Sequence, residues 1–326
     1  MAETRQPNPL PTPPAAARVE SRGTEIDLRY VRYEALGAGL VGAVFRGKHT
    51  GLGYEVAIKE LKDVFAHFPF LQRAEVVKRL KRELTGQAQL RHPCAVAVLD
   101  QNLDVVRPYF VTELCAGGSL RKRLEAAPRG LPVDVALRIF VQVASALEAA
   151  HAAGLVHQGV RPENVLFDDR GNGKVSDFGL ARILELDANA PPFFIGASSP
   201  TYLAPELLLR GGAAGPESDV YALGIVLYEV LTGQVPGRRS PLPSAARPEV
   251  PRELDAIFER MTADRREERH PNAGALLDEL FAALPRLGHR TDLVLSVRTP
   301  AAAAERSVRP HVNGVAPRER LTEAVP

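Results

Sequence analysis

The pattern of apolar and polar positions changes once along the chain and divides the structured region into two parts. Between about residues 33 and 112, short segments with β-branched residues lie between glycine-rich turns, which is typical of strands. One segment in this part, residues 71–90, places apolar residues at helical spacing, and His92 and Pro93 follow it as a stop signal. The expected strands cover residues 41–46, 54–59, 96–99 and 109–112.

The second part of the chain has a mostly helical pattern. Residues 133–153 carry apolar residues on one face, and Gly154 is suited to end that helix. Short strands are expected beside Asn164 and Asp177. Further helices are expected at residues 219–231, 253–261 and 273–284. A small β-rich lobe followed by a larger helical lobe is an α+β, two-lobed fold, and ligands commonly bind between such lobes.

We expect a single structured domain at residues 27–287. Residues 1–26 are rich in Pro, Ala and Arg, and residues 288–326 look similar, which is typical of disordered segments. Within the domain, the small lobe is expected at about residues 30–114 and the large lobe at about 115–287.

Composition indicates a soluble globular protein, with 45% hydrophobic and 25% charged residues. A net charge of +2 gives no field that would attract nucleic acid, so no nucleic-acid partner is expected.

No stretch reaches the roughly eighteen apolar residues of a membrane span, and the first residues lack the apolar core of a secretory signal. The two cysteines, Cys94 and Cys115, lack metal-ligand spacing, so a cytoplasmic protein is expected. Heavy use of Ala, Arg, Gly and Pro is typical of a GC-rich bacterial genome.

Two features of the β-rich part can bind phosphate. Residues 37–44 (GAGLVGAV) follow the pattern G-x-G-x-x-G-x-V, in which glycines let backbone N–H groups approach phosphates closely. An ordinary glycine-rich hairpin explains this pattern equally well. Lys59 ends an apolar strand, so it either reaches solvent along its stem or binds phosphate. A phosphate-binding lysine needs a fixed carboxylate partner, and Glu83 on the basic helix is the candidate.

The later motifs occur in the order found in protein kinases. HQGVRPEN at residues 157–164 is similar to the catalytic loop H-R-D-x-K-P-x-N. Residues 177–179 (DFG) and 204–206 (APE) match two further kinase motifs. With the glycine-rich segment and Lys59, these motifs make about residues 33–284 resemble a eukaryotic-like Ser/Thr protein kinase of the kind that many bacteria carry. The resemblance implies a kinase fold that binds ATP with Mg²⁺ or Mn²⁺.

The resemblance also assigns individual residues to roles. Asn164 and Asp177 are the positions that hold the metal ion in kinases. Nucleotide binding is implied for Leu36, Gly37, Gly39, Gly42, Val44, Ala57, Lys59, Glu83, Thr112, Glu113, Cys115 and Leu166. Structural roles are implied for His157, Phe178, Gly179, Glu206, Asp219 and Arg269.

The catalytic loop departs from the family at the position that matters most for transfer. Gly159 stands where kinases have the aspartate that accepts the substrate hydroxyl proton, and Gln158 replaces the preceding arginine. Arg161 replaces the usual lysine but keeps a positive charge toward the γ-phosphate. Neither Glu163 nor the turn containing Asp168 offers a convincing replacement acid. The sequence therefore predicts a pseudokinase in which no catalytic residue is intact.

Two further segments concern regulation and docking. The resemblance places an activation segment at residues 177–206, where Ser198, Ser199 and Thr201 are candidate phosphorylation sites or ordinary loop residues. After Gly233 the chain reaches a Pro-rich stretch within a few residues, and we expect this segment to be too short for the helix that helps kinases dock protein substrates.

Three functions remain open from the sequence. The first is an ATP-binding pseudokinase that regulates or scaffolds signalling through a protein partner of unknown identity. The second is an active Ser/Thr kinase with an atypical catalytic loop. The third is an interaction module that binds no nucleotide.

Overall fold

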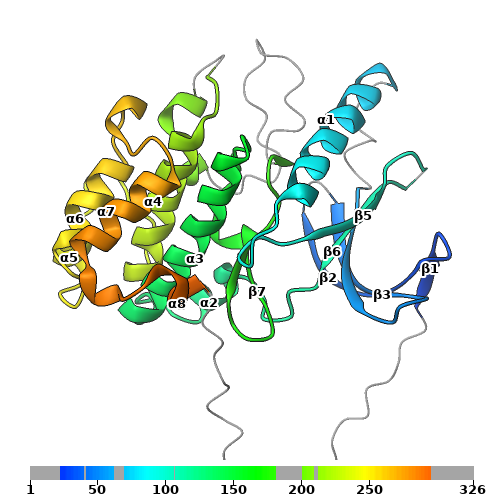
Figure 1. Ribbon diagram of the computed structural model, residues 1–326, viewed down its shortest axis with the longest axis horizontal. Helices are drawn as coiled ribbons and strands as arrows, with labels where there is room; N and C mark the ends of the chain where they lie inside the picture. Colours follow the sequence, from blue (N-terminus) through cyan, green and yellow to red (C-terminus); the bar gives the residue numbers. More distant parts are fainter. Residues whose placement is uncertain are drawn as a thin grey trace, which may run out of the picture.

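The two lobes expected from the sequence are both present in the structure. The computed structural model describes residues 23–39, 42–61, 70–105, 107–180, 200–208 and 212–294. Strands gather on one side of the molecule and helices on the other, with residues 114–119 connecting the two lobes (Figure 1).

The small lobe is a six-stranded antiparallel sheet with the order β1-β2-β3-β4-β6-β5. Its strands are β1 Thr24–Ile26, β2 Tyr30–Gly39, β3 Gly42–His49, β4 Glu55–Glu60, β5 Val98–Asn102 and β6 Tyr109–Glu113. Helix α1, Phe70–Gln89, connects β4 to β5 and lies against the sheet (Figure 1). This is the one helix that the spacing of apolar residues predicts within the small lobe.

Strand β6 is buried because apolar clusters cover both faces of the sheet. Successive side chains of a strand point to opposite faces. Tyr109 and Val111 therefore pack with Ile58 of β4 in one cluster. Phe110, between them, packs with Leu84 of α1 in the other cluster. The sheet thus has an apolar core on each side of β6.

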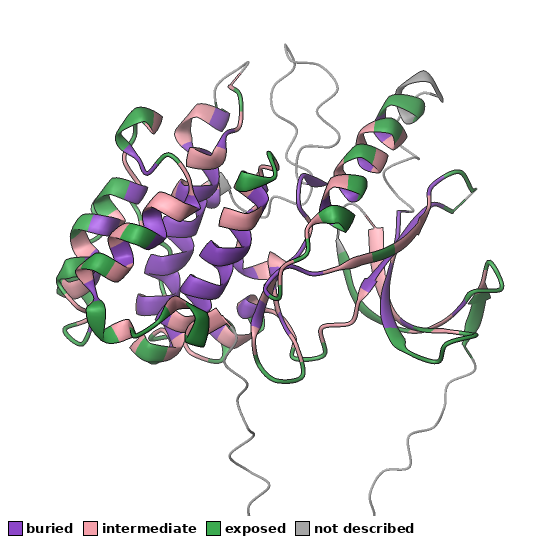
Figure 2. Ribbon diagram, viewed as in Figure 1, coloured by how far each residue is buried: buried purple, intermediate pink, exposed green. Residues whose placement is uncertain are grey.

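The large lobe is built around helices α3 and α4, which are its most deeply buried elements (Figure 2). The helices are α2 Leu120–Glu125, α3 Val133–Ala152, α4 Pro216–Thr232, α5 Pro243–Ala246, α6 Glu253–Met261, α7 Ala273–Ala283 and α8 Arg290–Val294. A two-stranded sheet of β7 Val165–Phe167 and β8 Gly173–Val175 faces the small lobe. Short 3₁₀ turns occur at Pro162–Asn164, Pro200–Tyr202, Pro205–Leu208, Arg266–Glu268 and Pro285–Leu287.

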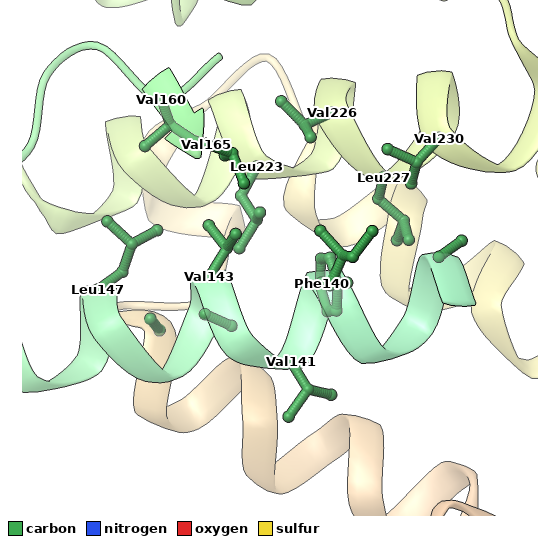
Figure 3. Packing of buried hydrophobic residues seen from close by; sticks show 14 of the residues in the cluster. Phe140, Val141, Val143, Leu147, Val160, Val165, Leu223, Val226, Leu227 and Val230 are labelled. Carbon is green, nitrogen blue, oxygen red and sulfur yellow. The ribbon is translucent and has the colours of Figure 1, made fainter. Parts of the chain in front are cut away.

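Contact between α3 and α4 forms the centre of the large-lobe core. Phe140 and Val143 of α3 lie against Leu223 and Leu227 of α4 (Figure 3). All four side chains are buried. Helix α4 is apolar around most of its circumference because other helices, including α3 and α6, surround it.

The structure confirms the α+β, two-lobed fold class, and it corrects both expected ends of the domain. Strand β1 pairs with β2 although disorder was expected through residue 26. Helix α8 places Leu293 and Val294 on the large-lobe core although a tail was expected from residue 288. These elements have only three and five residues, which is too short to show a hydrophobic period. Within the described residues, no helix has the length and apolar character that a membrane span needs.

Replacement of Leu223 by alanine is expected to destabilise the domain strongly. The side chain is fully buried between α3 and α4, so its removal leaves a cavity that typically costs about 2–5 kcal/mol. The matched control is Leu52→Ala, because Leu52 is 74% exposed and its loss is expected to cost less than about 0.5 kcal/mol. Urea unfolding measures both variants, and equal midpoints would contradict this description of the core.

Candidate functional site

The β7–β8 sheet brings the two expected metal-binding positions to the junction of the lobes. Val165 pairs with Val175, so Asn164, which precedes β7, and Asp177, which follows β8, lie at the same end of the sheet. The Ser176 N–H donates to the Asn164 carbonyl at 2.8 Å, which holds these two ends together.

Lys59 and Asp177 come from different lobes and form an ion pair. Lys59 is on β4, and its ammonium also lies 5.7 Å from the centre of the Phe110 ring. Asp177 has a positive φ of 68°, a conformation that is uncommon for residues other than glycine. The structure therefore brings together the lysine and the aspartate that the sequence assigned to the nucleotide and the metal ion.

The expected pairing of Lys59 with Glu83 is not the one that the structure shows. The Glu83 carboxylate instead accepts hydrogen bonds from Arg82 Nε and Nη2 at 3.0 and 2.6 Å. It also lies against the backbone of Gly179, where an added Cβ would come within 2.4 Å of Glu83 Oε2. Asp177 takes the place of Glu83 as the counter-ion of Lys59. The Arg82 side chain is 77% exposed, so its pair with Glu83 is weak and opposes a rearrangement little.

The glycine-rich segment forms the β2–β3 hairpin and lies over the end of β4. Gly37 pairs with Val44, and Gly39 pairs with Gly42, while residues 40 and 41 lie outside the described residues. At Gly42 an added Cβ would come within 1.8 Å of the Glu60 carbonyl oxygen, so only glycine permits this approach of β3 to β4.

The remaining nucleotide positions lie on neighbouring strands and on the connecting segment. Val44 pairs with Lys59, and Ala57 pairs with Thr112. Ala57 and Lys59 are two residues apart on β4, so their side chains point to the same face of the sheet. Leu36 on β2 is exposed. Glu113 and Cys115 lie at the start of the connection, and Leu166 of β7 bridges to Ser119 at its end. Burial and the nearby Glu113 carboxylate raise the pKa of the Cys115 thiol to about 12.

Buried Asp219 holds the backbone of the loop that contains Gly159. Its carboxylate accepts the N–H groups of His157 and Gln158, each at 2.7 Å, and lies 3.0 Å from His151 Nε2. His157 is fully buried and packs on Phe178 with ring centres 4.5 Å apart. Burial lowers the pKa of His157, which keeps its imidazole neutral.

Gly159 takes part in hydrogen bonds through its backbone N–H and carbonyl groups. Its N–H donates to His157 Nδ1 at 3.1 Å, and its carbonyl accepts Asn164 Nδ2 at 2.8 Å. His157 Nε2 then donates to the Ser176 carbonyl at 2.9 Å. Because the Asn164 amide donates through Nδ2, its Oδ1 lies on the other side of the amide group, where it can bind a cation.

Arg161 and Glu163 belong to a network of charges that the sequence did not reveal. Glu163 accepts from Arg161 Nε at 2.7 Å and from Arg121 Nε at 2.8 Å. Arg121 also donates to Glu229 at 2.6 Å and to the Tyr202 hydroxyl at 2.7 Å. Burial raises the pKa of Glu163, but the hydrogen bonds from the two arginines outweigh it and lower the pKa to about 2.

Glu206 and Arg269, for which the sequence implies structural roles, form a largely buried ion pair. The Arg269 guanidinium donates through Nη1 and Nη2 to the two Glu206 carboxylate oxygens, each at 2.9 Å. It also donates to the carbonyls of Ala263, Asp264 and Glu217. Burial raises the pKa of Glu206, but the bonds from Arg269 and other groups outweigh it and lower the pKa. This pair braces the 3₁₀ turn at Pro205–Leu208.

The structure covers only part of the expectations about phosphorylation sites and about the segment after Gly233. Ser198 and Ser199 lie outside the described residues, and Thr201 lies in the 3₁₀ turn at Pro200–Tyr202. The region after Gly233 was expected to lack a helix, but it contains the four-residue helix α5, whose Ser244 hydroxyl donates to Asp255. The chain leaves room for a single turn there.

Comparison with known proteins decides the family. A model of the protein kinase domain matches residues 30–287, which is most of the chain. The chain belongs to the protein kinase family. Kinase domains use ATP and a divalent metal ion in general, and the arrangement of Lys59, Asn164 and Asp177 at the lobe junction agrees with that use.

Several Ser/Thr kinases are similar to this kinase domain. It is 32% identical over 314 residues to serine/threonine-protein kinase PknL of Mycobacterium tuberculosis, an alignment that covers 91% of this chain and 74% of PknL. It is 33% identical over 271 residues to serine/threonine-protein kinase Pkn1 of Myxococcus xanthus, covering 76% of this chain and 37% of Pkn1. CBL-interacting protein kinase 4 of Oryza sativa subsp. japonica is 35% identical over 209 residues, covering 64% of this chain and 45% of that kinase. The chain thus spans less than half of the last two.

The kinase domain offers oxygen ligands that fit Mg²⁺. Within the described ranges, no three His, Cys, Asp or Glu side chains gather as a self-sufficient metal site. Magnesium in kinases needs few protein ligands, because phosphate oxygens and water supply the others. The Asn164 amide oxygen and the Asp177 carboxylate are oxygen donors of the required type.

Replacement of Arg269 by methionine is expected to destabilise the kinase domain by about 3–5 kcal/mol. The substitution leaves the Glu206 carboxylate without its guanidinium in a partly buried place. Arg265→Met is the matched control, because the Arg265 side chain is 73% exposed where it pairs with Glu268. Thermal and urea unfolding measure both proteins, and equal stabilities would contradict a bracing role.

Glu163 is expected to stabilise the kinase domain in a pH-dependent way. Its folded pKa lies below the unfolded value, so its contribution is present above about pH 4.3 and is lost as pH falls toward 2. The difference in urea midpoint between the wild type and Glu163→Gln should therefore narrow below about pH 4.3. A difference that stays constant from neutral pH to about pH 3 would contradict the lowered pKa.

Proposed function

We propose that this kinase domain binds ATP with Mg²⁺ in the cytoplasm and acts as a pseudokinase that regulates or scaffolds signalling through a protein partner. The observation that carries the proposal is Gly159. It stands within an otherwise ordered catalytic loop, and glycine has no side chain that can accept a proton from a substrate hydroxyl.

Retention of the nucleotide positions supports ATP binding. Lys59 already faces an anionic group, the Asp177 carboxylate, across the lobe junction. A phosphate group can take over that interaction with the lysine, since both are oxyanions. Asp177 and Asn164 Oδ1 would then hold the metal ion, which when bound neutralises charge on the phosphate oxygens.

Neither of the two nearby carboxylates considered as a replacement acid, Glu163 and Asp168, is free for that role. Glu163 is held by Arg121 and Arg161 and has a pKa of about 2, so it is a weak base. Asp168 accepts the N–H groups of Arg170 and Asn172 at 3.0 and 2.8 Å, which confirms its place in the β7–β8 turn. Both carboxylates therefore have structural partners.

The expected consequence is a large loss of transfer rate. A positioned general base typically contributes about 10²- to 10⁴-fold. Arg161 keeps a positive charge on the loop, but its Nε donates to Glu163. Its positive charge can still attract phosphate, which supports binding more than turnover.

The names of the similar proteins favour a second candidate, an active Ser/Thr kinase. Phosphoryl transfer depends mainly on positioning and charge stabilisation, so a kinase without its aspartate can retain slow transfer.

A third candidate, an interaction module without nucleotide, gains support from the direct Lys59–Asp177 pair, which already satisfies both charges.

Thermal denaturation with ATP and Mg²⁺ separates nucleotide binding from the module without nucleotide. We expect the wild-type melting temperature to rise with ATP concentration, since a ligand that binds only the folded state stabilises it. Lys59→Met should abolish the rise, because it removes the phosphate-binding cation. A wild-type melting temperature that does not change at millimolar ATP would favour the module without nucleotide.

Incubation with γ-labelled ATP, Mg²⁺ or Mn²⁺ and a generic basic protein separates the pseudokinase from the active kinase. We expect no label transfer by the wild type above the Lys59→Met control. Transfer that the control abolishes would contradict the pseudokinase proposal and support an active enzyme with an atypical loop.

A further inference from the structure

An ion pair joins the two lobes beside the segment that connects them. Glu113 is the last residue of β6 in the small-lobe sheet, and Lys174 is the middle residue of β8 in the large lobe. The Lys174 ammonium donates to both Glu113 carboxylate oxygens, at 2.7 and 2.8 Å. The Lys174 side chain is only 13% exposed, so water screens this pair less than a surface pair.

The Glu113 carboxylate also ties a third segment to the pair. Its Oε1 accepts the Ala97 N–H at 2.8 Å, while the Glu113 N–H donates to the Ala97 carbonyl at 3.0 Å. The residues before Ala97 bond to β8, since the Val96 N–H donates to the Val175 carbonyl at 2.8 Å. One carboxylate thus links β6, the segment before β5, and β8.

Two sets of backbone hydrogen bonds lie on either side of this ion pair. On one side, Val175 bonds to the backbone of Cys94 and Val96. On the other side, the Gly117 N–H donates to the Phe167 carbonyl at 2.8 Å, and the Phe167 N–H donates to the Gly118 carbonyl at 2.9 Å. Figure 1 shows strand β7 of the β7–β8 sheet between the large-lobe helices and the small lobe. At Glu113 itself, the ion pair adds to the backbone bond with Ala97 and to the pairing with Val56 of β4.

The two cysteine thiols near Lys174 do not supply a competing anion. Burial raises the pKa of the Cys94 and Cys115 thiols to about 12, so both are neutral at physiological pH. The positive charge of Lys174 opposes the rise in the pKa of both thiols, because its ammonium lies close to the connecting segment. Its negative partner in this region is Glu113.

We propose that Lys174 is a positioning residue for nucleotide binding. By holding the Glu113 side chain, it fixes the backbone at the start of the connecting segment in the conformation that presents its groups to the nucleotide. This inference rests on the proposed ATP-binding function. Loss of the pair removes one restraint from the start of the connecting segment, so nucleotide binding must order that segment further, which weakens affinity.

Isothermal titration with ATP and Mg²⁺ tests this role in the full chain. Lys174→Met is expected to raise the Kd roughly three- to tenfold, the range for ordering one or two side chains or backbone groups on binding. Lys174→Arg keeps the charge and should stay within about twofold of the wild type. The matched control is Lys81→Met. It removes an exposed lysine of α1 from its pair with Asp104 and should leave the Kd unchanged.

Hydrogen exchange of residues 113–118 gives a second measurement on the same proteins. Exchange should accelerate in Lys174→Met but not in Lys174→Arg or Lys81→Met. A Kd equal to that of the wild type in Lys174→Met, even with a lower melting temperature, would show a purely structural pair and overturn the inference alone. Absence of nucleotide binding by the wild type would instead overturn the proposed function, and the positioning role with it.

Discussion

The catalytic loop keeps its conformation because Asp219, a carboxylate buried in α4, accepts hydrogen bonds from the loop backbone. Two consecutive N–H groups, those of His157 and Gln158, end on this one side chain. Gln158 has a φ of 63°, a conformation that needs such support in a residue other than glycine. Helix α4 packs against α3, so the loop is attached to the most deeply buried part of the large lobe (Figure 3).

This arrangement explains how the loop can lose its catalytic side chain and still hold the rest of the site. The bonds at Gly159 use its own N–H and carbonyl, and Asn164 is positioned by that carbonyl. None of these interactions depends on the side chain at position 159. In the proposed pseudokinase, glycine at this position therefore removes a chemical step without removing the geometry that places Asn164 and Asp177 at the lobe junction.

Short motifs predicted which residues meet at the lobe junction where those residues lie close together in the sequence. The catalytic-loop and DFG motifs pointed to Asn164 and Asp177, which the fold places at the same end of the β7–β8 sheet, and the structure confirmed the β-rich and helical lobes. Partners distant in sequence could not be predicted. The bond from Arg121 to Glu229 spans 108 positions, and the bond from Lys174 to Glu113 spans 61. The choice of Asp177 over Glu83 as the partner of Lys59 depends on how α1 sits against the sheet, which no local pattern encodes.

The most direct test of the central claim restores the missing acid. Gly159 does not have a positive φ, so its backbone can accept an aspartate without strain of that kind. Label transfer from γ-labelled ATP should be measured for the wild type and for Gly159→Asp, each beside the same protein carrying Lys59→Met. If the site is complete except for its acid, Gly159→Asp will transfer phosphate and the wild type will not. Transfer by the wild type that the aspartate fails to increase would contradict the account.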